Sequence, residues 1–153
     1  MPGKPVADVS RIARVLRLHT DSRPESLREA RREVRHAVAQ AGLGLRAAQD
    51  LEVAAGEVLT NTHDHAYAAG TGPVFVEVFH TSRMVGVVII DIGAADTPTV
   101  VPSTPPPSTD HRGRGLYMVG RLADEVNIRV SAIGHGLAVL VVKRFASGPV
   151  LAS

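Results

Sequence analysis

Apolar residues in the first half of the chain recur at spacings of three and four, which is the period of an amphipathic helix. Two helices are predicted in this way, and the second runs from about residue 45 to 67. Ser26 and Glu29 have the spacing of a capping box for the first helix, and Gly42 is placed to end it. The first 20 residues have no clean period, so they predict either a strand or a short helix. The apolar stripe of the second helix comprises Ala47, Leu51, Ala54, Ala55, Val58, Thr62 and Ala66.

The second half of the chain has shorter apolar runs that are typical of strands. VFVEVFH and VGVVIIDIG predict an antiparallel pair, and the second should be central and covered because it is apolar on both faces. The proline-rich residues 94–112 can form neither a central strand nor a helix interior. A helix over about 115–125 and a hairpin up to residue 145 follow. This order predicts an α+β fold, a two-layer α/β sandwich whose mostly antiparallel sheet carries its helices on one face.

Composition narrows the class of protein. The 153 residues suit one domain, 1–153, and aromatic residues are so few, at 3%, that the core must be aliphatic. The chain has no cysteine, which excludes disulfides and cysteine-based metal sites. Its longest apolar run, VGVVII, is too short to cross a bilayer, and the first 20 residues lack a signal-peptide pattern. We therefore expect a soluble, cytoplasmic protein that does not bind membranes.

The net charge is +2, from 17 basic and 15 acidic residues. The densest basic stretch, REARREVRH, alternates arginine with glutamate along the sequence. This mixture is typical of a solvated helix face, whereas a nucleic-acid surface is usually more one-sided. We therefore expect no direct contact with nucleic acid.

Several polar residues of the second predicted helix lie beside its apolar stripe at about 100° per residue. They are Asp50, Glu57, Asn61 and Asp64. An edge of this kind could line a cleft, although an ordinary polar face would give the same pattern. His63 and His65 are two residues apart, so they do not share a helix face and do not form a zinc motif.

Two further signals concern phosphate and a nucleobase. Gly113 and Gly115 precede a predicted helix, where free amides and the helix dipole favour an anion, but a plain turn is the alternative. Asp91 ends an apolar strand two residues before Gly93. A carboxylate there needs a partner, and the exocyclic amine of adenine is a suitable donor. A turn-forming Asp-x-Gly is the alternative for this pair.

The order of these motifs is more specific than any one of them. E-x-x-x-N on a helix, D-x-G after a strand and G-x-G after a long loop resemble the N, G1 and G2 boxes of the gyrase, MutL and histidine-kinase ATPases. That superfamily shares the Bergerat ATP-binding fold. GEVLTNTHDHAY and GRGLYMVGRLADEV are most similar to the single-domain anti-sigma factor serine kinases. The resemblance covers about residues 20–145.

The resemblance implies roles for the residues of the helical motif. Glu57 aligns with the general base, and Asn61 aligns with the residue that holds Mg²⁺. His65 matches a residue common in this branch, for which we expect a structural hydrogen bond.

It also implies an ATP site. Asp91 would accept from the adenine amino group, and Gly93 would give the base room. Residues 94–112 take the place of the ATP lid. The phosphates would be held at the start of the last predicted helix by Gly113, Arg114, Gly115 and Leu116.

Two positions depart from the family pattern. Ala95 stands at the usual second glycine of D-x-G-x-G, and Leu137 and Ala138 stand where a threonine is usual in the last strand. Both departures bear on nucleotide affinity more than on the fold.

The function implied is that of an ATP- and Mg²⁺-dependent serine/threonine-protein kinase and anti-sigma factor. It would sequester a sigma factor and phosphorylate an anti-anti-sigma protein of the STAS type, and the resemblance also admits a homodimer. One alternative is a non-catalytic module that holds ATP, or no nucleotide, and sequesters a partner. A detached histidine-kinase ATPase domain is disfavoured, because no phospho-accepting helix pair comes before the motifs.

Overall fold

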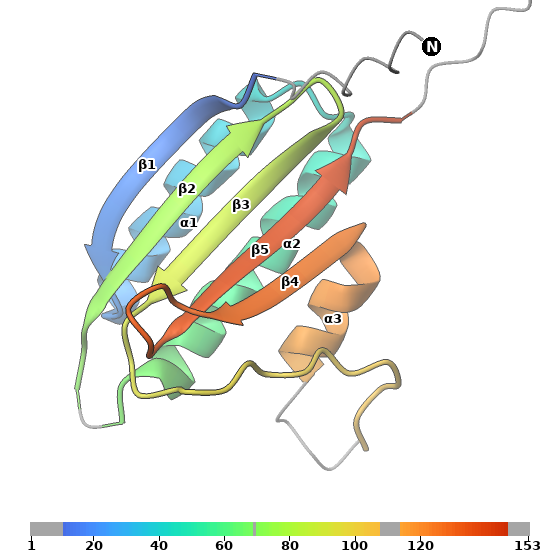
Figure 1. Ribbon diagram of the computed structural model, residues 1–153. Coiled ribbons are helices and arrows are strands. Elements are labelled where there is room, and N and C mark those ends of the chain that lie inside the picture. Colours follow the sequence, from blue (N-terminus) through green and yellow to red (C-terminus); the bar gives the residue numbers. More distant parts are fainter. Residues whose placement is uncertain (1–10, 69, 108–113, 147–153) are drawn as a thin grey trace, which may run out of the picture.

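The computed structural model describes residues 11–68, 70–107 and 114–146. Five strands form one antiparallel sheet in the order β1-β2-β3-β5-β4, and the helices cover one face of it (Figure 1). The predicted α+β two-layer architecture is therefore confirmed. The elements are β1 Ala13–Asp21, α1 Pro24–Gln40, α2 Leu45–Asn61, the π-helical turn η1 Thr62–Ala66, β2 Pro73–His80, β3 Met84–Asp91, α3 Arg114–Leu122, β4 Glu125–Val130 and β5 Leu137–Arg144.

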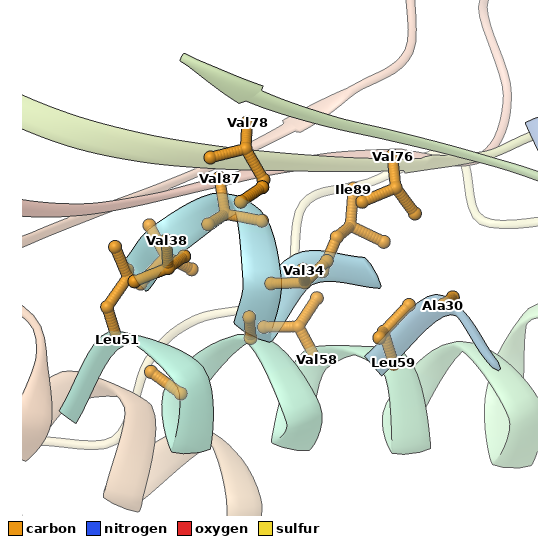
Figure 2. Close-up of a cluster of buried hydrophobic side chains, with 14 of the residues drawn as sticks. Ala30, Val34, Val38, Leu51, Val58, Leu59, Val76, Val78, Val87 and Ile89 are labelled. Atoms are coloured by element: carbon orange, nitrogen blue, oxygen red, sulfur yellow. The ribbon is translucent and has the colours of Figure 1, made fainter. Parts of the chain in front are cut away.

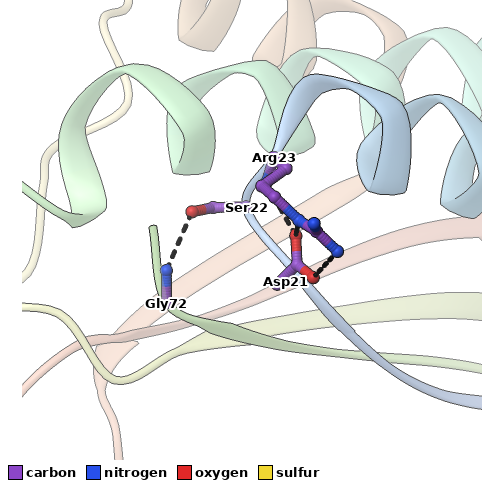
Figure 3. A network of polar contacts seen from close by, with 4 residues as sticks. All are labelled: Asp21, Ser22, Arg23 and Gly72. Atoms are coloured by element: carbon purple, nitrogen blue, oxygen red, sulfur yellow. Dashed lines mark hydrogen bonds and ion pairs between the residues drawn. The ribbon is translucent and has the colours of Figure 1, made fainter. Parts of the chain in front are cut away.

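The start of α1 differs from the predicted capping box. The helix begins at Pro24, with Arg23 as its N-cap, so Ser26 already lies in the first turn. Proline suits the first position of a helix. The amide hydrogen that proline lacks would have no hydrogen-bond partner within the helix at that position. Asp21 accepts hydrogen bonds from the backbone amide and the guanidinium of Arg23, at 2.9–3.0 Å (Figure 3). Gly42 follows the helix with a φ of +93°, as predicted for its end.

The second predicted helix changes geometry near its C-terminal end. Regular α-helix ends at Asn61, and η1 continues the coil as a π-helical turn. His63 in this turn donates from Nδ1 to the carbonyl oxygen of Ser22, at 2.9 Å. Ser22 also exchanges hydrogen bonds with the backbone of Gly72, so the β1–α1 turn holds both ends of the η1–β2 connection (Figure 3).

The core is aliphatic, as the composition predicts. Valine, leucine and isoleucine side chains of α1 and α2 pack against those of β2 and β3 (Figure 2). Each such side chain contributes about 1.5–3 kcal/mol when fully buried. The buried face of α2 is wider than the predicted stripe, because it also includes Ala48 and Leu59, while Ala47 is half-buried. The reason is that α2 lies between α1 and α3 and packs against both as well as the sheet.

β3 occupies the predicted central position, but it is not covered on both faces. Val87 and Ile89 face the helices and are fully buried. Val88 and Ile90 point to the other face and are only half-buried. The described residues therefore cover these two apolar side chains only in part.

α3 ends three residues earlier than predicted. The amide of Asp124 already donates to the carbonyl of Val142, at 2.9 Å, which draws Glu125 into β4. Within the described ranges, no helix is long and apolar enough to cross a membrane.

Candidate functional site

A cavity of about 340 Å³ opens between the C-terminal part of α2, the carboxyl end of β3 and the segment before α3. Its walls are largely apolar, and its polar side chains come from α2, η1, β3 and the loop after β3. The lining residues are Val58, Asn61, Thr62, His65, Ala66, Asp91, Ala95, Thr99, Val100, Pro102, Leu116, Ile128, Leu137 and Val139. Three of the residues predicted to bind a nucleotide, from three separate motifs, thus meet at one cavity.

Asp91 is the buried carboxylate of this cavity, with 6% of its surface exposed. The sheet places it there because it is the last residue of the central strand. Its Oδ1 accepts from the amide of Gly93 at 2.9 Å and from the amide of Leu137 at 3.3 Å. Both bonds end on the same oxygen, so among the described residues Oδ2 has no donor and is left to accept from one in the cavity. This geometry satisfies a buried carboxylate and still gives it a free acceptor.

The loop after β3 is held by two side chains that sequence reasoning did not select. The hydroxyl of Tyr67 accepts from the amide of Ile92 at 3.0 Å and donates to the carbonyl of Pro73 at 2.6 Å. His135 places Nδ1 at 2.9–3.1 Å from the carbonyl oxygens of Ile92 and Gly93, so this nitrogen is the donor. Tyr67 and His135 therefore fix the backbone that follows Asp91.

The sequence analysis singled out the segments that contain Tyr67 and His135, but not the contacts of these two residues. Tyr67 ends the GEVLTNTHDHAY motif, and His135 lies in the AIGHG turn of the last hairpin. Neither position indicates a contact with the loop after Asp91. Burial raises the pKa of Tyr67 above its usual value, which keeps the phenol neutral and able to donate.

Gly93 is needed for close packing. A Cβ at this position would overlap the carbonyl oxygen of Ala66 in η1, so a side chain would push the loop away from the π-helical turn. Gly136 has a similar role on the opposite side, where a Cβ would overlap the backbone of Asp91. Its φ of +82° also lies in the region that favours glycine. The structure thus gives these glycines a packing role around Asp91.

Glu57, Asn61 and Gly115 converge beside the cavity. A Cβ on Gly115 would lie 2.7 Å from Oε2 of Glu57 and 3.6 Å from Oδ1 of Asn61. The start of α3 therefore approaches both polar side chains of α2 closely. The free amides at a helix start and the positive end of its dipole favour an anion at this point.

Other predicted site residues lie elsewhere. Gly113 is outside the described residues, and Arg114 is exposed at the first position of α3. Asp50 forms an ion pair with Lys143, at 3.3 Å, so it connects α2 to β5 away from the cavity. Asp64 is exposed on η1 and does not line the cavity.

The structural hydrogen bond expected of His65 is not among the contacts of the described residues, so it stays a prediction. Within the described part of the chain, His63 makes a bond to Ser22, and His65 is exposed at the rim of the cavity.

The two departures from the family pattern are compatible with this geometry. Among the described residues, only glycines have positive φ, so the backbone at Ala95 needs no glycine. The carbonyl of Ala95 accepts from the amide of Gly136, at 2.8 Å. Leu137 lines the cavity with its side chain, and its amide supports Asp91. A backbone group here contacts the carboxylate whatever the side chain.

The segment after Ala95 lies along the cavity. Residues 96–107 contain no helix or strand, and Thr99, Val100 and Pro102 line the cavity. Val101 lies against α3 at Gly120, where a Cβ would approach it to 2.8 Å. In Figure 1 this stretch runs below the sheet towards α3.

Comparisons with known proteins agree on the fold. The sequence model of the histidine kinase-like ATPase domain matches residues 20–143. A structure of the RsbU and RsbW domains of Rv1364c from Mycobacterium tuberculosis is similar, with a TM-score of 0.58 and 22% identity over 86% of this chain. This chain spans 35% of that one.

A second similar structure is the histidine kinase domain of a blue-light activated histidine kinase from Erythrobacter litoralis EL346. It has a TM-score of 0.46 and 17% identity, over 78% of this chain and 59% of that one. A comparison with curated proteins gave no match.

Proposed function

Because the chain belongs to the histidine kinase-like ATPase family, matched over residues 20–143, we propose that the cavity binds ATP for transfer to a protein hydroxyl. The observation that carries this proposal is the position of Asp91 and Asn61 in one cavity, with Glu57 and the start of α3 beside it. One part of the site suits a nucleobase, and the other suits phosphates.

The adenine ring would lie between the apolar walls with its amino group donating to Oδ2 of Asp91. Guanine has a carbonyl oxygen where adenine has this amine, and two acceptors facing each other repel. A site built to accept a hydrogen bond rejects a base that cannot donate it. Asp91 would therefore select adenine, and residues 94–112 would act as the lid over it.

The phosphates would lie at the start of α3, near Gly113, Arg114, Gly115 and Leu116. Asn61 would supply an amide oxygen to Mg²⁺, which takes most of its ligands from phosphates and water and needs one or two from the protein. The position of Asn61 supports this role, because Asn61 lines the cavity and its Oδ1 lies close to Gly115 at the start of α3. The bound ion would neutralise phosphate charge.

The chemical step would use Glu57 as the base. The oxygen of a serine or threonine forms a bond to the γ-phosphorus as the bond from that phosphorus to the β–γ bridging oxygen breaks. ADP leaves, and the hydroxyl proton passes to the carboxylate of Glu57. General-base catalysis of this kind contributes typically about 10²–10⁴-fold.

The partners would be a sigma factor, which the protein sequesters, and an anti-anti-sigma protein of the STAS type, which it phosphorylates. Two observations support this assignment: the motif pattern of the sequence, and a fold shared with a structure whose name includes an RsbW domain.

The test uses radiolabelled ATP with the purified wild type, the Glu57→Gln variant and the anti-anti-sigma protein encoded nearest to this chain. Glutamine keeps the shape of the side chain but loses its basicity. We expect the partner to be labelled by the wild type, and the rate with the variant to fall by about 10²–10⁴-fold. ATP and partner binding should be unchanged. Tight complexes without label from either protein would refute the kinase and favour a non-catalytic sequestering module.

A further inference from the structure

The charged residues of α1 form separate rows, although they alternate in the sequence. Arg28, Arg31, Arg32 and Arg35 are all exposed and line one groove together with α2. The glutamates of α1 follow each other at steps of four, so they form a row of their own along the helix. They do not line the groove, and they are Glu25, Glu29 and Glu33. The charged residues of α1 are exposed, as predicted, and their separation on the helix surface makes one flank basic.

The groove has a volume of about 330 Å³, and its α2 wall is formed by Glu52 and Val53. Arg31 reaches across to α2, where its guanidinium donates to the carbonyl of Gly56, at 3.1 Å, and to the hydroxyl of Thr60. Gly56 leaves room for this crossing, because its open side lies against the Nε of Arg31. The floor of the groove is thus fixed by the fold itself.

The other three arginines have no such fixed role. Within the described residues, Arg28, Arg32 and Arg35 form no hydrogen bond or ion pair. Arg28 and Arg32 are four residues apart, as are Arg31 and Arg35, and like charges at this spacing destabilise a helix by about 0.2–0.5 kcal/mol per pair. The arginines of the groove therefore repel one another along the helix, and this repulsion is relieved when an acidic group binds between them.

We propose that this basic groove is a docking surface for an acidic segment of a protein partner. Three unpaired guanidinium groups can each bind a carboxylate through two parallel hydrogen bonds. Val53, with 47% of its surface exposed, offers an apolar contact in the same groove. A nucleic acid is the poorer occupant, because its closely spaced charges form a continuous backbone that would also pass Glu52 and the neighbouring glutamate row, whereas a short acidic segment can contact the arginines alone.

The position of the groove connects it to the proposed chemistry. Val53 and Glu57 are four residues apart on α2, so they are neighbours on its surface. A partner bound to Val53 and the arginines would lie one helical turn from the proposed base. The inference rests on the proposed function in this respect: the groove would hold the protein whose hydroxyl reaches Glu57.

The test compares two triple variants that change the net charge equally. The groove variant is Arg28→Glu, Arg32→Glu and Arg35→Glu, which leaves Arg31 in its structural role. The control is Arg17→Glu, Arg83→Glu and Arg129→Glu, three exposed residues outside the groove. The probes are the purified STAS-type anti-anti-sigma proteins and sigma factors of the host, together with a labelled 20-base-pair DNA duplex. Binding of each probe is measured by biolayer interferometry at two salt concentrations, and ATP binding is measured separately.

We expect the groove variant to lose about 10- to 100-fold in affinity for the protein partner, while the control changes by less than about threefold. ATP binding should be equal in all three proteins. Equal partner affinity of the groove variant and the wild type would overturn the docking surface, even if ATP transfer occurs. Loss of partner binding without any transfer by the wild type would support the surface and refute the kinase. Tight binding of the duplex, or binding of no host protein, would overturn the proposal.

Discussion

Replacement of Tyr67 by phenylalanine tests how the loop after Asp91 is held. The substitution removes one hydroxyl, which accepts from the amide of Ile92 and donates to the carbonyl of Pro73. Pro73 is exposed, so water can replace its bond, whereas Ile92 is half-buried and its amide is left without a good partner. An unsatisfied group of this kind costs about 1–2 kcal/mol. For a chain of about 150 residues this lowers the Tm by roughly 2–8 °C.

The same change should weaken ATP binding, because Ile92 connects Asp91 to Gly93. Thermal unfolding and calorimetric titration with Mg-ATP measure the two effects. Tyr117→Phe is the matched control, since Tyr117 is the other tyrosine of the chain and forms no hydrogen bond within the described residues. A Tyr67→Phe variant as stable as the Tyr117→Phe variant, with unchanged ATP affinity, would refute the role of the hydroxyl.

The pH dependence of this effect follows from the raised pKa of Tyr67. A raised pKa means that the folded state favours the neutral phenol, so the stabilisation is complete below the ordinary pKa of about 10. It is lost as the pH rises from there through the higher folded value. We therefore expect the Tm difference between the wild type and Tyr67→Phe to be constant from pH 6 to pH 9 and to shrink above pH 10.

Three further outcomes follow from the structure. Gly93→Ala should cost at least about 1–3 kcal/mol in unfolding free energy by urea titration, because its Cβ would overlap the carbonyl of Ala66; an unchanged midpoint would contradict the packing. Residues 96–107 should exchange amide hydrogens faster without nucleotide than with Mg-ATP; equal protection in both states would count against a lid. Asp21→Asn should lower the Tm at pH 7, because the bonds from Arg23 hold the pKa of Asp21 well below its usual range. This difference should decrease as the pH falls below about 4 towards the lowered folded value, and a difference as large at pH 2 as at pH 7 would argue against the ion pair.

The periodic features of the fold could be predicted from the sequence. The two long helices, the strand pair and the final hairpin depend on local alternation of apolar and polar residues, which the sequence displays directly. Asp91 and Asn61 were predicted as site residues from their motifs, and the structure brings them to one cavity.

The features that were missed depend on contacts between distant residues. The hydrogen bond from the amide of Ile92 to Tyr67 spans 25 positions and that from His135 to the carbonyl of Ile92 spans 43, so no local pattern indicates them. The π-helical turn likewise forms where His63 meets the carbonyl of Ser22, 41 positions away. The basic row on α1 was missed for a different reason: charges that alternate along a sequence can separate on a helix surface.

Calorimetric titration of the wild type and Asp91→Asn with Mg-ATP and Mg-GTP tests the central claim most directly, because Asp91 is the group proposed to recognise the base. The claim predicts that the wild type binds ATP at least about tenfold more tightly than GTP, since only adenine donates to the free carboxylate oxygen. Asparagine removes the charge and can turn a donor towards the base, so this preference should largely disappear in the variant. Absence of binding at millimolar Mg-ATP, or equal affinity of the wild type for ATP and GTP, would contradict the assignment of the cavity as an ATP site.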